Sequence, residues 1–191
     1  STLFNLITGV YPLSSGSISV FGQDVSKQPA YNRAQLGIAR TFQTSKLFQG
    51  LTVRENLYAS LRQALGEKKI SWLANPADSD RLRSESSAIL EKVDLLKKAD
   101  VLVSDISHGE SRQLEVAMAL AMRPKILMLD EPAGGLGPQD IEWMNNLIRN
   151  LTATMSVLIV EHHMDVVMTV CDRLYVLNFG EVIASGDAEK V

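Results

Sequence analysis

Four apolar residues followed directly by two carboxylates leave few folds open to this chain. Residues 126–129 read Ile-Leu-Met-Leu, and Asp130, Glu131 and Pro132 come next. An apolar run of this length is typical of a strand buried on both faces, as in parallel sheets covered by helices. In such sheets, ligands bind at the carboxyl ends of the strands. The run therefore predicts an α/β fold with Asp130 and Glu131 at its candidate site.

Adjacent carboxylates at a strand end suit phosphoryl transfer. One carboxylate can help to hold Mg²⁺ through its waters, and the second can orient and deprotonate an attacking water. In this interpretation Asp130 serves the metal and Glu131 is the base. The alternative is that the pair only caps the turn that precedes Pro132. Spacing alone leaves both interpretations open.

The rest of the chain predicts strands that alternate with helices, which indicates a parallel sheet. Two further strands are expected, a short buried one over residues 36–42 that delivers Gln43 to its end, and an apolar one over 156–161 that is followed by His162. The other expected elements are a helix ending at Gly9, a strand over 16–21 closed by a turn at 22–24, helical segments over 52–64 and 80–98, a surface loop at 75–79, helices over 107–122, 139–151 and 163–171, and a hairpin ending near Ser185.

Two capping boxes mark helix starts, one formed by Thr52 and Glu55 and one by Ser107 and Glu110. At the second, free backbone N–H groups and Gly109, which permits close backbone approach, suit an anion such as a γ-phosphate. The alternative is that this box, like most, only caps its helix.

His162 follows an apolar strand and could sense the terminal phosphate at the same sheet edge as Asp130. The alternative is an ordinary polar surface residue. Because neighbouring residues of an extended chain point to opposite sides, we expect His162 and His163 to diverge, and we expect no shared zinc site.

Composition narrows the function classes further. The formal net charge of −3 gives the chain no overall positive potential to attract the phosphates of a nucleic acid, which disfavours nucleic acid as a partner. Cys171 is the only cysteine, so an internal disulfide and a CxxC metal site are excluded and a reducing compartment fits. The longest apolar runs fall far short of the ~20 residues of a membrane-spanning helix.

Taken in order, these motifs resemble the ATP-binding-cassette family along the whole chain. Ser1 and Thr2 look like the end of its phosphate-binding loop, G-x-x-x-x-G-K-[ST], so the resemblance implies that Ser1 ligates Mg²⁺ and Thr2 approaches the α-phosphate. The glycines and lysine of that loop are absent, so we expect a truncated chain that binds ATP poorly and is inactive alone.

The resemblance assigns the remaining site residues. Gln43 matches the Q-loop glutamine, with catalytic and Mg²⁺ roles; Asp130 matches the Walker B aspartate that serves Mg²⁺; Glu131 matches the catalytic base; and His162 matches the switch histidine. The signature motif, which contacts ATP, corresponds to Ser107, His108, Gly109 and Glu110, with His108 where glycine is usual, and residues 134–137 correspond to the D-loop, with Gly137 where aspartate or asparagine is usual.

The implied fold is a P-loop NTPase core with a parallel sheet, a small antiparallel β element and an inserted α-helical subdomain. Residues 1–191 would form part of one such ATPase domain, and residues 44–105 would form the helical subdomain within it.

The sequence Arg40-Thr41-Phe42-Gln43 and the sequence of residues 51–57 are similar to segments of the ATPases of branched-chain amino acid importers. The resemblance implies an ATP- and Mg²⁺-dependent motor subunit on the inner, cytoplasmic face of the cell membrane. It would form a head-to-tail homo- or heterodimer beneath permease subunits, served indirectly by an external substrate-binding protein. The alternatives are a non-transport cassette, as in DNA repair or translation, and a regulatory module that does not hydrolyse ATP.

Overall fold

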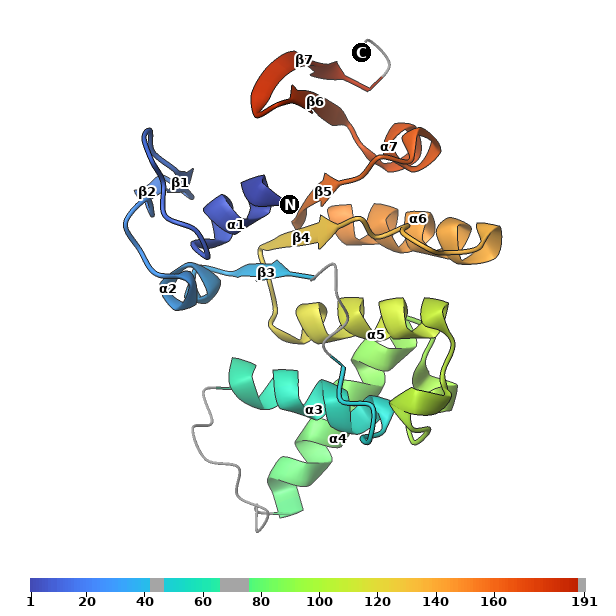
Figure 1. Cartoon of the computed structure of the whole chain (residues 1–191). Coiled ribbons are helices and arrows are strands. Elements are labelled where there is room, and N and C mark those ends of the chain that lie inside the picture. The colour runs from blue at the N-terminus through green and yellow to red at the C-terminus, as the bar shows by residue number, and fades with distance from the viewer. Residues whose placement is uncertain (42–46, 66–75, 189–191) are drawn as a thin grey trace.

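A three-stranded parallel sheet lies at the centre of the computed structural model, which describes residues 1–41, 47–65 and 76–188 (Figure 1). Its strands are β3 (Ile38–Arg40), β4 (Ile126–Asp130) and β5 (Ser156–Val160), in the order β3-β4-β5. Asp130 is in register with Val160, so β4 and β5 end at the same level. The predicted parallel sheet is confirmed, and it carries the ends of β4 and β5 to one edge.

The central strand β4 is buried on both faces, as its apolar run predicts, whereas β5 has no buried residue and its Leu158 is 38% exposed. Leu127 and Leu129 join a large core shared with helices on one face, whereas Met128 joins a smaller core with Phe4 of α1 (Thr2–Thr8) on the other. All three β4 side chains are fully buried. The alternation within a single strand therefore fixes which helices cover each face.

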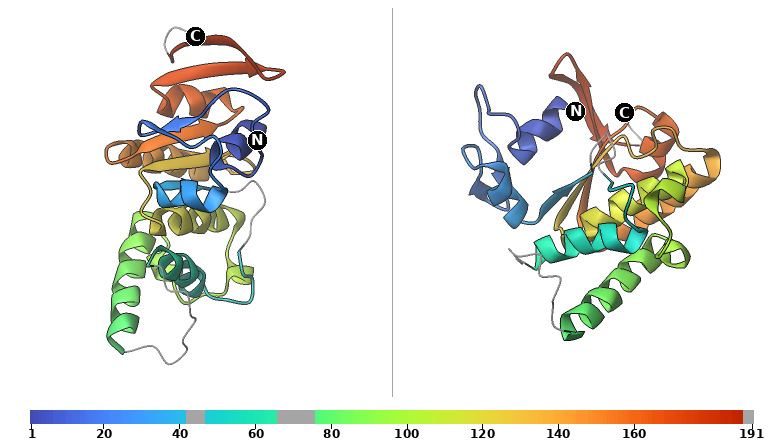
Figure 2. Two further views of the ribbon diagram at one scale, coloured as in Figure 1. Left: turned by 90° about the vertical axis from the view of Figure 1, so that its left-hand side faces the viewer. Right: turned by 60° about the horizontal axis from the view of Figure 1, so that its bottom comes forward.

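The larger core is built mainly by helices below the sheet (Figures 1 and 2). Leu57, Leu90 and Leu114 are buried in it without exposure. The helices that contribute are α3 (Val53–Ala64), α4 (Pro76–Lys92), α5 (His108–Ala121) and α6 (Pro138–Thr152), with short 3₁₀ turns η1 (Leu96–Lys98) and η2 (Val103–Asp105). In the described ranges, no helix combines the length and apolar character needed to span a membrane.

Both predicted capping boxes are formed. Thr52 Oγ1 accepts a hydrogen bond from the Glu55 N–H at the start of α3, and Ser107 Oγ accepts one from the Glu110 N–H at the start of α5. Each glutamate side chain in turn accepts from the backbone N–H of its cap residue. Local sequence therefore suffices to set these two helix starts.

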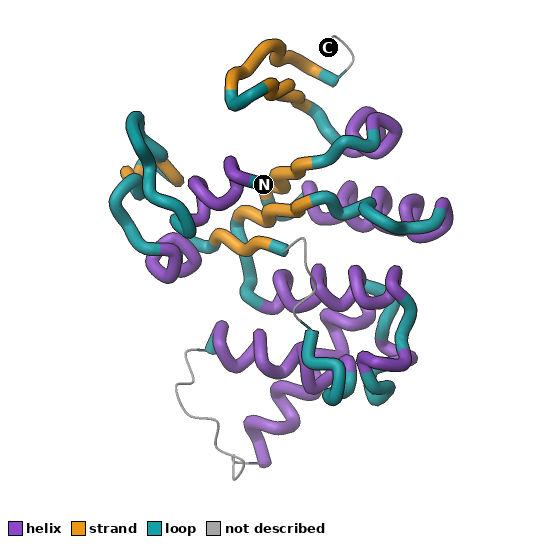
Figure 3. The backbone as a smooth tube through the Cα atoms, in the orientation of Figure 1, coloured by secondary structure: helices purple, strands orange, loops and turns teal. Residues whose placement is uncertain are grey.

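Two antiparallel hairpins complete the strands, and Figure 3 shows them apart from the central sheet. One pairs β1 (Ser19–Val20) with β2 (Gln23–Asp24), and the other pairs β6 (Arg173–Asn178) with β7 (Glu181–Asp187). The expected turn at residues 22–24 is wrong in its bounds, because Phe21 and Gly22, both with positive φ, form the turn. That geometry is the usual one for a two-residue hairpin.

The expected surface loop at residues 75–79 is wrong over most of its length, because α4 begins at Pro76. Proline lacks an N–H, but the first N–H groups of a helix have no intrahelical partner, so proline starts a helix at little cost. The helices α2 (Ala30–Gln35) and α7 (Met164–Val170) complete the fold, and α2 was not predicted.

A buried arginine explains why α2 packs against α1. Arg33 is 2% exposed and donates to the carbonyl oxygens of Leu6 and Ile7, at 2.7 and 2.8 Å, near the C-terminus of α1. It also donates to the carbonyls of Gln28 and Ser26. The guanidinium therefore satisfies terminal carbonyls of α1 and meets the negative end of its dipole.

We expect Arg33→Lys to lower the free energy of unfolding by about 2 kcal/mol. A lysine ammonium cannot reproduce the several N–H donors of the planar guanidinium, so buried carbonyl groups are left without a hydrogen bond. Urea unfolding followed by circular dichroism measures the change. Arg81→Lys is the matched control, since Arg81 is exposed and pairs with Glu85 at the surface. Equal losses in the two variants would contradict the role assigned to Arg33.

Candidate functional site

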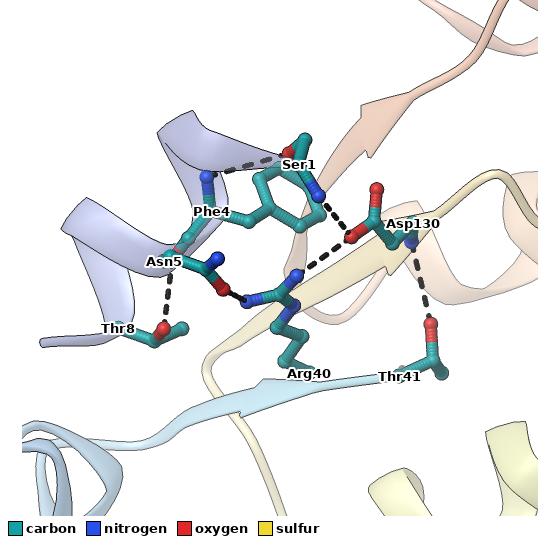
Figure 4. Close-up of polar contacts among 7 residues, drawn as sticks. All are labelled: Ser1, Phe4, Asn5, Thr8, Arg40, Thr41 and Asp130. Carbon is teal, nitrogen blue, oxygen red and sulfur yellow. Dashed lines mark hydrogen bonds and ion pairs between the residues drawn. The ribbon is translucent and has the colours of Figure 1, made fainter. Parts of the chain in front are cut away.

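Asp130, at the carboxyl end of β4, is the centre of a polar cluster (Figure 4). Its Oδ2 accepts hydrogen bonds from the Ser1 α-amino group at 2.8 Å and from the Arg40 guanidinium at 2.7 Å. Its backbone N–H donates to Thr41 Oγ1 at 3.3 Å. The residue is 2% exposed, so these charges interact where water screens them poorly.

The cluster keeps Asp130 ionised. Burial raises the pKa of a carboxyl group, but the hydrogen bonds from the Ser1 nitrogen and from Arg40, together with the positive charge of the guanidinium, outweigh it, so the pKa of Asp130 lies below its ordinary value. A carboxyl group must be ionised at neutral pH to bind a divalent cation.

Arg40 is a site residue that our sequence reasoning missed. Besides Asp130, its guanidinium donates to Asn5 Oδ1 at 2.6 Å and lies 5.3 Å from the centre of the Phe4 ring. The side chain is only 9% exposed. A usable signal was present, since a charge inside an otherwise apolar strand requires a buried partner.

Ser1 offers a hydroxyl oxygen beside the Asp130 carboxylate as a second potential metal ligand. As the N-cap of α1, its hydroxyl accepts from the Phe4 N–H at 3.4 Å, while its amino group contacts Asp130. Figure 4 shows the second carboxylate oxygen of Asp130 turned away from Arg40. A hydroxyl and a carboxylate are the hard oxygen ligands that Mg²⁺ prefers, so the donor set fits that ion. Thr2, the first residue of α1, is exposed beside them.

Glu131 has a backbone conformation that is unusual for a glutamate. Its φ is 50°, in the left-handed region. Its N–H still donates to the Val160 carbonyl at 2.8 Å, and its own carbonyl accepts from the Gly134 N–H at 3.0 Å. Strained residues of this kind gather at functional sites, which favours a role for Glu131 beyond capping the turn.

The end of β5 brings Glu161 and His162 to the same edge as Asp130 and Glu131, as predicted. His162 is 66% exposed, whereas the Glu161 carboxylate is fully buried. Burial raises the pKa of that carboxyl, but hydrogen bonds from the His163 ring and from the N–H groups of His162, Ala133 and His163 outweigh it, so the pKa lies below its ordinary value. Our sequence reasoning gave Glu161 no role.

The expectation that His162 and His163 diverge is wrong. Their ring centres are 4.3 Å apart, and their Nδ1 atoms lie 3.5 and 2.8 Å from Glu161 Oε1. The strand ends at Val160, so the strict alternation of an extended chain no longer applies to these residues. Their potential ligand atoms and that of Glu161 all lie within 4.8 Å of one another. The Glu161 oxygens, however, already accept hydrogen bonds from four N–H groups, so the contacts of this cluster are met by the protein itself.

The Ser107–Glu110 segment lies at the N-terminus of α5 and contacts the loop after Glu131. His108 Nε2 is 3.4 Å from the Gly134 carbonyl oxygen, and the Asp140 carboxylate lies so close to Gly109 that it leaves no room for a Cβ there. Burial raises the pKa of Glu110, but hydrogen bonds from Lys98 and Ser107 outweigh it and lower the pKa. Gln43 lies outside the described residues. The structure thus gathers Ser1, Asp130, Glu131 and His162 at one sheet edge and places the α5 end beside residues 134–140.

Comparisons with known proteins agree with this architecture. The family model described as ABC transporter matches residues 1–134. The high-affinity branched-chain amino acid transport ATP-binding protein LivG of Escherichia coli strain K12 is 36% identical over 197 residues, which cover 100% of this chain and 77% of that protein. The corresponding protein BraF of Pseudomonas aeruginosa strain PAO1 shows the same identity and coverage.

Solved structures show the same fold. MJ1267, an ATP-binding cassette of an ABC transporter, superposes with a TM-score of 0.85 at 29% identity, covering 99% of this chain and 76% of that one. Its ADP conformation gives a TM-score of 0.84 with the same identity and coverage. The parallel sheet, its site-bearing edge and the family match agree, and the chain belongs to the ABC transporter family as an ATPase of the ATP-binding-cassette type.

Proposed function

We propose that this chain is the ATP-hydrolysing motor part of an importer for branched-chain amino acids. The observation that carries the proposal is the meeting of Ser1, Asp130, Glu131 and His162 at one edge of the parallel sheet. The names of the LivG and BraF relatives support the solute class. We propose a membrane-peripheral location, which follows from the permease partner.

The position of each site residue suggests its role in ATP hydrolysis. Asp130 and the Ser1 hydroxyl would hold Mg²⁺, together with Gln43, while Thr2 lies next to Ser1 to meet the α-phosphate. Bound Mg²⁺ would neutralise charge on the phosphate oxygens. Glu131 accepts the proton of the attacking water, and the exposed His162 contacts the terminal phosphate.

The signature segment would serve a second cassette. Ser107, His108, Gly109 and Glu110 lie at the N-terminus of α5, where the positive end of the helix dipole attracts anions, and their contacts run to residues 134–140 rather than toward Ser1. A head-to-tail dimer brings this end to the nucleotide held by the other subunit. We propose that residues 44–105 form the helical subdomain that transmits this closure to the permease.

Transport in a reconstituted system tests the proposal. The full-length protein is combined in vesicles with its permease subunits and external binding protein. We expect Mg²⁺-dependent ATP hydrolysis and ATP-driven uptake of leucine into vesicles that contain all components. Hydrolysis without uptake of any branched-chain amino acid would favour the non-transport cassette, and no hydrolysis would favour the regulatory module.

A further inference from the structure

One buried carboxylate joins the two segments that carry Glu131 and His162. Glu161 Oε2 accepts a hydrogen bond from the Ala133 N–H at 3.1 Å. Its Oε1 accepts from the His162 and His163 N–H groups at 2.8 and 3.2 Å, and contacts His163 Nδ1 at 2.8 Å. The side chain has no exposed surface. A single acceptor thus links the end of β5 to the loop that follows β4.

This link, the Glu161 bridge, reaches the loop that follows β4 close to Glu131. Ala133 lies in the turn that the Gly134 N–H closes on the Glu131 carbonyl at 3.0 Å. Glu131 itself has a positive φ and is held at its own N–H by Val160, the residue before Glu161. The strained glutamate is therefore fixed on both sides by the end of β5, once through the backbone and once through the Glu161 side chain.

The chemistry of the bridge requires a carboxylate. An ionised carboxylate only accepts hydrogen bonds, through two oxygens with about four lone-pair sites, and so suits a position that faces four N–H donors. An amide of the same shape would turn its NH₂ group toward some of these donors. A purely local role, as an anchor for the start of α7 through His163, would not use the Ala133 contact, which joins residues 28 positions apart.

We propose that Glu161 is a positioning residue that holds His162 and the Glu131 turn in one arrangement for hydrolysis. The inference rests on the proposed function, in which Glu131 and His162 act on the same ATP. Glu161 acts by fixing the distance between a base and a phosphate-contacting histidine that follow different strands.

Steady-state ATP hydrolysis by the full-length protein carrying Glu161→Gln tests the inference. We expect kcat to fall about 10- to 100-fold, in line with other residues that orient catalytic groups, while the KM for ATP stays within about twofold of the wild type. Glu142→Gln, on an exposed position of α6, is the matched control and should leave both constants unchanged. A wild-type kcat for Glu161→Gln, or a raised KM at unchanged kcat, would overturn the inference.

Further variants separate positioning from local folding. Glu161→Asp keeps the carboxylate and should recover part of the lost kcat. His163→Ala removes the contact with the start of α7 but leaves the Ala133 bridge, so it should lower kcat far less than Glu161→Gln. If His163→Ala lowers kcat as much as Glu161→Gln, the role of Glu161 is local and the inference fails. If Glu161→Gln does not fold, the kcat values of Glu161→Asp and His163→Ala are compared instead, and a larger loss in His163→Ala than in Glu161→Asp contradicts the inference.

A nucleotide-free measurement keeps this inference distinct from the proposed function. In ¹⁵N-labelled wild-type protein and Glu161→Gln, we expect the amide resonances of both Ala133 and His162 to shift, because glutamine removes the negative charge and one of the two oxygens that accept their hydrogen bonds. A wild-type protein without ATPase activity would defeat the proposed function, yet these shifts would still test the bridge. An unchanged Ala133 resonance would show that Glu161 does not join the two segments.

Discussion

Replacing Glu131 by glutamine in the full-length protein is expected to lower kcat for ATP hydrolysis by about 10³-fold. Glutamine keeps the size of the side chain but cannot accept the proton of the attacking water, and a general base is worth about 10²- to 10⁴-fold. The backbone contacts of Glu131 with Val160 and Gly134 do not involve the side chain and should persist. Single-turnover and steady-state phosphate release measure the change.

The same variant should still bind nucleotide. Because Asp130, Ser1 and the helix starts are untouched, we expect ATP affinity and ATP-driven dimerisation to be retained or strengthened, as judged by size-exclusion chromatography with light scattering. Glu181→Gln on the exposed strand β7 is the control and should hydrolyse ATP at the wild-type rate. If Glu131→Gln turns over within threefold of the wild type, Glu131 only shapes the turn before Pro132.

Local sequence predicted what depends on neighbours along the chain. The two capping boxes follow from residues three positions apart, and the apolar run of β4 follows from burial on both faces. The register of β4 with β5 then brought Asp130 and His162 to one edge, as the parallel topology requires. Those parts of the site could be read from the sequence because each depends on one element and its direction.

Residues that act through distant partners were not predicted. Arg40 contacts Asn5 and Asp130, which are 35 and 90 positions away, and Arg33 binds carbonyls of α1 more than 25 positions away. Glu161 was overlooked because its partner Ala133 belongs to another strand's loop. The divergence of His162 and His163 was mispredicted for a related reason, since strand alternation was extended past Val160, where β5 ends. A sequence pattern gives periodicity, whereas these contacts depend on how elements pack.

The Asp130–Arg40 pair gives the largest expected effect on stability. Both side chains are nearly buried, and the guanidinium is 2.7 Å from the carboxylate. Removing Arg40 leaves the buried Asp130 carboxylate with less compensation of its charge, at a cost of about 3 kcal/mol. We therefore expect Arg40→Gln to lower the free energy of unfolding by about that amount at pH 7, as measured by urea denaturation. Asp130→Asn combined with Arg40→Gln should be more stable than Arg40→Gln alone, because the poorly compensated buried charge is gone.

The pH dependence of this effect has a definite sign. The pKa of Asp130 is lowered in the folded protein, so the ion pair contributes stability above the unfolded pKa of about 3.9 and loses it as the pH falls through the lower folded pKa. Without Arg40 the folded pKa rises, because burial is then less well opposed. The difference in unfolding free energy between wild type and Arg40→Gln should thus be constant above about pH 5 and shrink below pH 4. A difference that stays the same at pH 3 and pH 7 would mean that Arg40 stabilises the fold through Asn5 and Phe4 alone, and that the Asp130 carboxylate does not depend on it.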